Sequence, residues 1–239
     1  MIIKEQLINK LQIWAPEDTA ESWDNVGLQV DTTRDIKRVA LVLEINLDTW
    51  DIIQKYDYDL IISHHPLIFK PLKSVGVDDW THNVLRYLIQ HNIGFYVSHT
   101  NLDSAENGVS DALLQQYGLN PKRVRDLNQG YGRVCEFDSP INIKDIQSNV
   151  QVVEQIIPEN LTINSIAFMG GSGKSFVHDI VEQDIDFYVT GELGYHEIQY
   201  LRQQKKGLFL LGHYQSEVFI LDTIHDKLNL LDIEIDIIK

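Results

Sequence analysis

The sequence predicts an α/β protein made of two similar halves, residues 1–126 and residues 127–239. Short runs rich in β-branched and apolar residues alternate with segments whose apolar residues recur at helical spacing, which is typical of α/β proteins. The order strand, helix, strand, helix, strand occurs twice along the chain. In both halves the middle strand begins with D-x-D, and the last strand leads to a histidine with a carboxylate four residues later. A chain of 239 residues with 44% hydrophobic content suffices for a sizeable core.

The first half opens with an amphipathic helix at residues 1–14, in which charged residues interrupt apolar residues at helical spacing. The predicted elements that follow are the strand RVALVLEI (38–45), the helix LDTWDIIQKY (47–56), the strand DYDLIISHH (57–65), the helix DWTHNVLRYLIQH (79–91) and the strand NIGFYVSHTNLD (92–103).

The second half repeats this order. Its predicted elements are the strand NSIAFMGG (164–171), the helix SFVHDIVEQ (175–183), the strand DIDFYVTGE (184–192), the helix GYHEIQYLRQQ (194–204) and the strand KGLFLLGHYQSE (206–217). Neighbouring βα units often look alike by chance, but the matched histidine–carboxylate endings favour a duplication. We expect the boundary between the halves at the polar stretch DLNQG, residues 126–130.

Composition argues against several classes of function. The formal net charge is −15, and no Lys/Arg cluster is longer than RQQKK, whereas a nucleic-acid-binding protein carries a basic surface. The single cysteine, Cys135, excludes an internal disulfide and suits a reducing compartment. The first helix does not have the pattern of a signal peptide, and no apolar run reaches the ~18 residues of a membrane span. We therefore expect a cytoplasmic protein with neither nucleic acid nor membrane as partner.

The candidate functional residues stand at predicted strand ends, where ligands collect in open α/β sheets. They are two adjacent histidines after the middle strand of the first half, and a histidine and a carboxylate after the last strand of each half: His64, His65, His99, Asp103, His213 and Glu217. Successive side chains of an extended strand point to opposite sides, so adjacent histidines suit two ions better than one. Pro66 keeps the end of this strand extended.

Imidazole and carboxylate groups without a thiolate favour Zn, Mn, Fe, Co or Ni. Two ions ~3.5–4 Å apart usually share a bridging carboxylate and a water molecule. Both Asp103 and Glu217 are available as the bridge. The sequence therefore predicts two divalent ions per chain, of unspecified identity.

Other motifs have simpler interpretations. GGSGKS (170–175) resembles a phosphate-binding loop, but Phe168 stands where that loop requires glycine, so a strand-to-helix turn is favoured. Turn chemistry explains SWDNVGLQV (22–30), and a role as a loop on the substrate side stays open. Four histidines on predicted helices are interpreted as surface or packing residues: His82, His91, His178 and His225. Whether His196 faces the site is left open.

Six motifs occur in an order that resembles one family: WDNVGLQV, DLIISHHPLIFKPLK, SHTNLDSAENGVSDAL, GGSGKS, TGE and GHYQSE. The chain resembles the GTP cyclohydrolase I type 2 homologues, also called the Ngg-interacting-factor-three-like family, in the short form without a central inserted domain. The resemblance runs from the first helix to the last strand. It implies a three-layer α/β fold with an internal duplication, a dinuclear metal centre between the halves and a toroidal homohexamer.

The resemblance also implies roles for particular residues. The implied metal ligands are His64, His65, Asp103, His213 and Glu217, with Glu217 touching both ions and His99 in or just behind this set. Glu44, Glu192 and His196 are candidates for the surrounding shell. Two positions depart from the family pattern, Glu44 in place of a common Asp and Asn107 in place of a common Gly. Asn tolerates left-handed backbone, whereas the role of Glu44 stays open.

Two functions remain as alternatives. The first is a metal-dependent hydrolase that acts on a nucleotide or heterocycle through an activated water, such as opening of the imidazole ring of GTP. The second is a non-catalytic metal-binding or scaffold protein that forms a ring-shaped oligomer. A storage site and a catalytic site can use identical ligands, so no residue separates the two.

Overall fold

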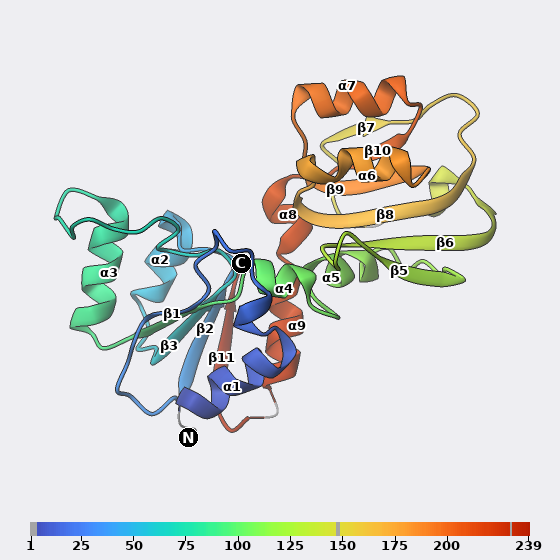
Figure 1. The fold of residues 1–239 in the computed structure, drawn as a ribbon. Coiled ribbons are helices and arrows are strands. Elements are labelled where there is room, and N and C mark those ends of the chain that lie inside the picture. The colour runs from blue at the N-terminus through green and yellow to red at the C-terminus, as the bar shows by residue number, and fades with distance from the viewer. Residues whose placement is uncertain (1–3, 147–148, 230) are drawn as a thin grey trace. The chain divides into compact units, whose positions relative to one another are not determined.

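The computed structural model describes residues 4–146, 149–229 and 231–239. The described chain forms two units, each built on its own mixed β-sheet (Figure 1). The first unit comprises Met1–Leu102 and Leu221–Lys239, and the second comprises Asp103–Ile220. The prediction of an α/β protein is confirmed, in the form of two mixed sheets.

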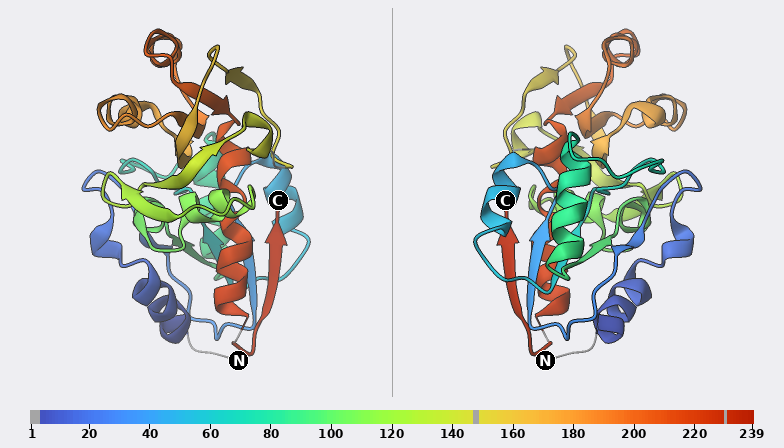
Figure 2. Two further views of the ribbon diagram at one scale, coloured as in Figure 1. Left: turned by 90° about the vertical axis from the view of Figure 1, so that its right-hand side faces the viewer. Right: turned by 90° about the vertical axis from the view of Figure 1, so that its left-hand side faces the viewer.

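The sheet of the first unit has five strands in the order β1-β4-β3-β2-β11. Four of them run parallel, and β1 runs antiparallel to β4 at one edge. Figure 2 shows the C-terminal strand β11 beside β2, with which it pairs. The strands are β1 (Gly27–Val30), β2 (Arg38–Val42), β3 (Leu60–Ser63), β4 (Gly94–Val97) and β11 (Glu234–Ile238).

Helices begin where the sequence offers a cap. The side chain of Asn46, the residue before α2, accepts a hydrogen bond from Thr49 N–H. The side chain of Asp79, the residue before α3, accepts one from His82 N–H. The helical segments of this part of the chain are α1 (Lys4–Trp14), the 3₁₀ turn η1 (Glu17–Thr19), α2 (Leu47–Ile53), α3 (Trp80–Gln90), α4 (Thr100–Ser104) and α9 (Ile220–Leu228).

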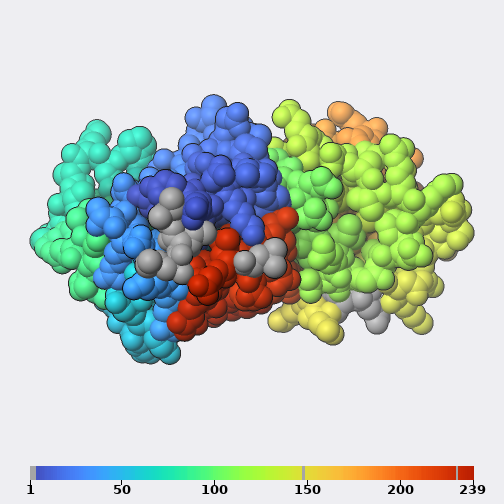
Figure 3. Space-filling view, turned by 90° about the horizontal axis from the view of Figure 1, so that it is seen from below, coloured from blue at the N-terminus to red at the C-terminus, as the bar shows by residue number. Residues whose placement is uncertain are grey.

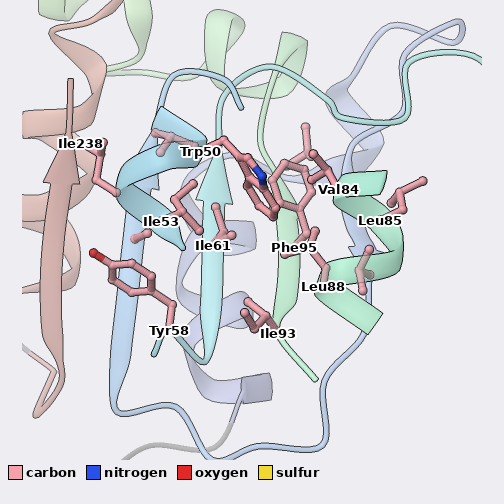
Figure 4. Packing of buried hydrophobic residues seen from close by; sticks show 14 residues of the cluster. Trp50, Ile53, Tyr58, Ile61, Val84, Leu85, Leu88, Ile93, Phe95 and Ile238 are labelled. Carbon is pink, nitrogen blue, oxygen red and sulfur yellow. The ribbon is translucent and has the colours of Figure 1, made fainter. Parts of the chain in front are cut away.

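The core of the first unit lies on both faces of its sheet. Trp50 of α2 and Leu88 of α3 pack with Phe95 of β4 on one face (Figure 4). Strand residues of opposite orientation, among them Leu41 and Ile62, are also fully buried. Burial of both faces is what parallel strands require, and it holds their carboxyl ends in fixed positions.

The sheet of the second unit has six strands in the order β5-β6-β8-β9-β10-β7, of which β8, β9 and β10 run parallel. One hydrophobic cluster packs this sheet against α6 and α7, and another packs it against α5. The strands are β5 (Arg123–Leu127), β6 (Gly132–Ile141), β7 (Glu154–Ile156), β8 (Ile163–Ser172), β9 (Phe187–Glu192) and β10 (Gly207–Leu210). The helical segments are α5 (Val109–Gln115), η2 (Ile143–Asp145), η3 (Lys174–Phe176), α6 (Val177–Glu182), α7 (Tyr195–Gln203) and α8 (His213–Glu217).

The two sheets share one arrangement. In each, three successive parallel strands are joined by helices, and an earlier strand runs antiparallel to the third of them: β1 beside β4, and β7 beside β10. The second aspartate of each D-x-D motif has the same role. Asp59 Oδ2 accepts from the N–H groups of Lys37 and Arg38, and Asp186 Oδ2 accepts from those of Asn164 and Ser165.

The predicted boundary at residues 126–130 is not where the structure divides. Residues 128–131 connect the antiparallel strands β5 and β6, and Asn128, Gln129 and Gly130 adopt the positive φ angles of a tight turn. The division falls instead after Leu102 and after Ile220. Figure 3 shows the consequence on the surface of the first unit, where N-terminal residues in blue adjoin C-terminal residues in red. Turn residues in a hairpin resemble those of a linker, which explains the error.

Among the described residues, no helix is both long enough and apolar enough to span a membrane.

Candidate metal centre

The carboxyl ends of β2, β3 and β4 meet at one edge of the first sheet. His64 and His65 directly follow β3, His99 follows β4 after one residue, and Glu44 lies just beyond β2. Backbone hydrogen bonds continue past the strands, from His64 N to Val42 O (3.2 Å) and from Ser98 N to Ser63 O (3.1 Å). The parallel register therefore brings three strand ends together, as the sequence predicts.

Three histidines form a compact cluster at this edge. His64, His65 and His99 each offer a ring nitrogen within 4.8 Å of those of the other two. Their ring centroids lie 5.0 to 5.5 Å apart. The expectation that the adjacent histidines diverge is not met, because β3 ends at Ser63 and both rings lie beyond the alternating part of the strand.

His64 is fully buried, and its hydrogen-bond partner determines which ring nitrogen carries the proton. Its Nδ1 lies 2.9 Å from the carbonyl oxygen of Ser98. A carbonyl oxygen only accepts hydrogen bonds, so the Nδ1 of His64 must donate. In the neutral ring the lone pair is then on Nε2, the form that binds a metal ion.

The other two histidines of the cluster have carboxylate partners at the same ring atom. His65 Nδ1 lies 3.4 Å from Glu44 Oε2, and His99 Nδ1 lies 2.9 Å from Asp24 Oδ1. Histidines that bind metal ions almost always donate their second N–H to a carboxylate or carbonyl group, which fixes the tautomer and the ring orientation. All three imidazoles meet this requirement, and the position of Glu44 beside His65 gives this residue a physical role.

Asp24 belongs to the segment 22–30, for which the sequence predicted a turn and left a role on the substrate side open. Its side chain has no exposed surface. Besides the bond to His99, it accepts hydrogen bonds from Thr100 Oγ1 (2.6 Å), Thr100 N (3.1 Å) and Asn25 N (2.8 Å). Burial raises the pKa of this carboxyl group, but the hydrogen bonds from His99 and Thr100 outweigh burial and hold the pKa well below its usual range. Asp24 is therefore an ionised group that orients His99.

The second unit presents an imidazole and a carboxylate on one turn of helix. His213 begins α8 and Glu217 ends it, so the two side chains lie on the same face, with Nε2 and Oε2 3.2 Å apart. His213 Nδ1 lies 3.2 Å from Oε2 of Glu192, the last residue of β9. The Glu217 side chain is only 5% exposed. His213 thus has the same outward Nδ1 contact as the three histidines of the first unit.

Two glycines of GGSGKS provide the space for this pair. A Cβ atom at Gly171 would collide with Glu217 Oε1 and would lie 3.5 Å from His213 Nε2. A Cβ atom at Gly170 would collide with Val109 Cγ1. Gly171 also has φ +61°, in the left-handed region that favours glycine. The motif forms the end of β8 and the following turn, and its glycines let α8 approach the strand.

Asp103, His196 and Asn107 are the remaining residues singled out from the sequence. Asp103 lies in α4, directly after the turn that the bond from Leu102 N to His99 O closes (2.8 Å), and it offers a carboxylate oxygen within 4.8 Å of one from Glu217. His196 is exposed on α7, where its ring contacts Tyr195. Asn107 has φ +59°, as expected for an asparagine at a position where relatives carry glycine.

A pocket of about 460 Å³ opens at the carboxyl ends of β8, β9 and β10 in the second unit. Glu192, the partner of His213, lines it together with Lys174 and Ser172. Pockets of this size are typical of small-molecule sites, and the carboxyl ends of parallel strands are where such sites occur.

These features define a class: an α/β protein with two mixed sheets, whose clustered histidines and carboxylates could hold metal ions. The chain belongs to the Duf34/NIF3 (NGG1p interacting factor 3) family, whose model matches residues 2–239. The resemblance inferred from the sequence motifs is therefore confirmed.

Relatives match nearly the whole chain. The GTP cyclohydrolase 1 type 2 homolog of Methanocaldococcus jannaschii is 32% identical over 245 residues, which cover 97% of this chain and 97% of the relative. The GTP cyclohydrolase 1 type 2 of Helicobacter pylori is 31% identical and covers 98% of this chain and 96% of its own length. The solved structure of reduced HcgD from Methanocaldococcus jannaschii has a TM-score of 0.85 at 27% identity, covering 99% of this chain and 97% of that chain.

Proposed function

We propose that this protein is a metal-dependent hydrolase of nucleotides or related heterocycles, with two divalent ions per chain. The observation that carries the proposal is the cluster of His64, His65 and His99, whose ring nitrogens lie within 4.8 Å of one another. The Nδ1 atoms of these histidines lie against oxygen atoms, an arrangement that leaves Nε2 to bind a metal ion.

The proposed ligands are those implied by the family resemblance, His64, His65, Asp103, His213 and Glu217. The donor set is imidazole and carboxylate without thiolate, which fits Zn, Mn, Fe, Co or Ni. The chain passes between the units after Leu102 and after Ile220. Asp103 follows the first of these positions directly, and Glu217 precedes the second by three residues.

Each neighbouring group of the chain has a defined task in this proposal. Ser98 O, Glu44, Asp24 and Glu192 hold the imidazole protons on Nδ1 and leave the Nε2 lone pairs for the centre. Glu217 contributes a negative charge that is nearly removed from solvent. Bound divalent ions supply Lewis acidity and activate water as a nucleophile near neutral pH.

No cysteine nucleophile competes with water in this proposal. The only cysteine, Cys135, is buried in β6, and burial together with the nearby Asp111 charge raises the pKa of its thiol to about 12. It is therefore a neutral thiol at physiological pH and a poor nucleophile.

The substrate class rests on two supports. The relative from Helicobacter pylori is described as a GTP cyclohydrolase, which points to a purine nucleotide whose imidazole ring is opened by water. The pocket of about 460 Å³ beside Glu192 has the size of a small-molecule site. A homohexameric assembly is proposed on the family resemblance.

The test is the metal content of protein purified without added metal, measured by inductively coupled plasma mass spectrometry, with a nucleotide screen on the same preparation. We expect two ions per wild-type chain and turnover of a nucleotide. Glu217→Ala should lose metal and all turnover. Glu182→Ala, at an exposed position of α6, is the matched control and should keep both. Full metal occupancy without turnover of any nucleotide, heterocycle or ester would replace the hydrolase by the metal-binding scaffold.

A further inference from the structure

We propose that Trp23 and Phe69 form a stacking subsite for the heteroaromatic ring of a phosphorylated ligand, that is, a nucleotide. The two rings lie in different loops of the first unit, with centroids 5.9 Å apart and planes at 64°. Trp23 is 58% exposed and Phe69 is 47% exposed. The subsite deepens the proposed function, since it names how the first unit would hold the substrate ring.

Hydrogen bonds tie the two loops together directly beside these rings. Asn25 Nδ2 donates to Ile68 O (2.5 Å), and Gln29 Nε2 donates to the same oxygen (3.1 Å). Ile68 N donates back to Gln29 Oε1 (2.8 Å). Two exposed rings are thus fixed in place before any ligand arrives, which lowers the entropy lost on binding.

The same loop connects the rings to the histidine cluster. The Trp23 ring lies edge-on to His99, with centroids 6.4 Å apart. The next residue, Asp24, accepts the hydrogen bond from His99 Nδ1 (2.9 Å). One segment therefore orients a candidate metal ligand and places an indole ring at its side. A planar ring stacked on Trp23 would lie next to the histidine cluster.

The charge of the adjoining loop indicates which chemical group is attached to the bound ligand ring. The loop between β3 and α3 contains Lys70 and Lys73 close to Phe69, whereas its two acidic residues, Asp78 and Asp79, lie at its far end beside α3. Both lysines are exposed, and they follow Phe69 by one and four residues. A ring stacked between the loops would thus have two cations within the same loop, which suits an attached phosphate group. Every nucleobase has a π-face, so stacking alone does not select the base.

The experiment is isothermal titration calorimetry of the full chain, as purified, with GMP, guanosine and ribose 5-phosphate. Wild-type protein should bind GMP more tightly than guanosine or ribose 5-phosphate. Trp23→Leu should weaken binding of GMP and guanosine about 5- to 150-fold, the range for loss of one base–aromatic stack, and should leave ribose 5-phosphate unchanged. Trp80→Leu is the matched control, since Trp80 is also partly exposed (40%) and edge-on to another ring, that of Trp50.

Three outcomes would overturn the subsite. Trp23→Leu could bind GMP as wild type does, or wild type could fail to prefer GMP over ribose 5-phosphate. Trp23→Leu could also change the sedimentation coefficient without changing GMP affinity, and the ring pair would then be a contact between copies of the chain. The proposed function is judged separately, by turnover. If GMP binding depends on Trp23 but no nucleotide is turned over, the subsite stands and the hydrolase proposal is wrong. If a nucleotide is turned over but GMP binding does not depend on Trp23, the hydrolase proposal stands and the subsite is wrong.

Discussion

Replacement of Gly171 by alanine tests the geometry of the second unit. The new Cβ atom would overlap Glu217 Oε1 and contact His213 Nε2, so either the Glu217 carboxylate or the end of β8 must move. Gly118→Ala is a matched control in the same unit. Its φ angle of +56° is close to the +61° of Gly171, but its Cβ atom would meet nothing within 4 Å.

The expected magnitudes separate backbone strain from displacement of the carboxylate. Placing alanine in the left-handed region costs about 1–2 kcal/mol in both variants. The overlap with a side chain that is 5% exposed adds the cost of overpacking, about 1–3 kcal/mol, at Gly171 only. Each kcal/mol lowers the melting temperature of a chain of this size by roughly 2–4 °C. Gly171→Ala should therefore melt several degrees below Gly118→Ala.

Circular dichroism melts in the presence of EDTA measure the stability difference without any contribution from metal. Metal content of the untreated proteins gives the second measurement. Gly118→Ala should keep the wild-type metal content, whereas Gly171→Ala should lose metal because Glu217 is displaced. Equal melting temperatures together with equal metal content would show that the Glu217 side chain does not lie against Gly171, and the reasoning about this glycine would be wrong.

Three further predictions follow from the same contacts. Asp24→Asn should lower metal affinity on the order of 10- to 100-fold, because an amide oxygen replaces the carboxylate that orients His99. The control Asp48→Asn, at the exposed start of α2, should leave metal affinity unchanged. Equal affinities of the two variants, measured by competition with a chelator, would refute this role of Asp24. The Cys135 thiol should react with Ellman's reagent only after unfolding in urea, at pH 7 and at pH 9 alike, because it is buried and its pKa is raised to about 12; reaction of the folded protein would refute this. Light scattering should give six times the 27.6 kDa chain mass, and a monomer at micromolar concentration would end the hexamer proposal.

The local features of the fold could be predicted because they depend on local sequence. Strand and helix alternation follows from the spacing of apolar residues, and the candidate ligands follow from the rule that sites lie at carboxyl ends of parallel strands. Asp24 could not be found in this way. It lies 75 residues before His99, and only the folded chain brings the two together. The same holds for Gly171 and Glu217, whose close approach leaves no local pattern in the sequence.

The similarity of the two sheets has a limit that only the register shows. Asp59 and Asp186 occupy equivalent positions, so Ser63 is equivalent to Thr190. The N–H of Ser98 bonds Ser63 O and the N–H of Leu211 bonds Thr190 O, which makes Ser98 equivalent to Leu211. On this count His99 matches Gly212 rather than His213. The two histidine–carboxylate motifs that suggested the duplication are thus offset by one residue. The sheets repeat, but the candidate ligands differ between the units.

The position of the candidate carboxylates follows from how the chain crosses between units. The parallel strands of each unit are followed by a short helix and then a longer one, α4 and α5 in the first case, α8 and α9 in the second. The longer helix joins the other unit in both cases, since α5 packs on the sheet of the second unit, and α9 contacts α1 of the first through Lys227 and Trp14. The two points of division, after Leu102 and after Ile220, fall inside helices, where the sequence shows no linker. Asp103 and Glu217 lie in the short helices that lead into the longer ones, where a shift of either carboxylate would also shift a segment that joins the units.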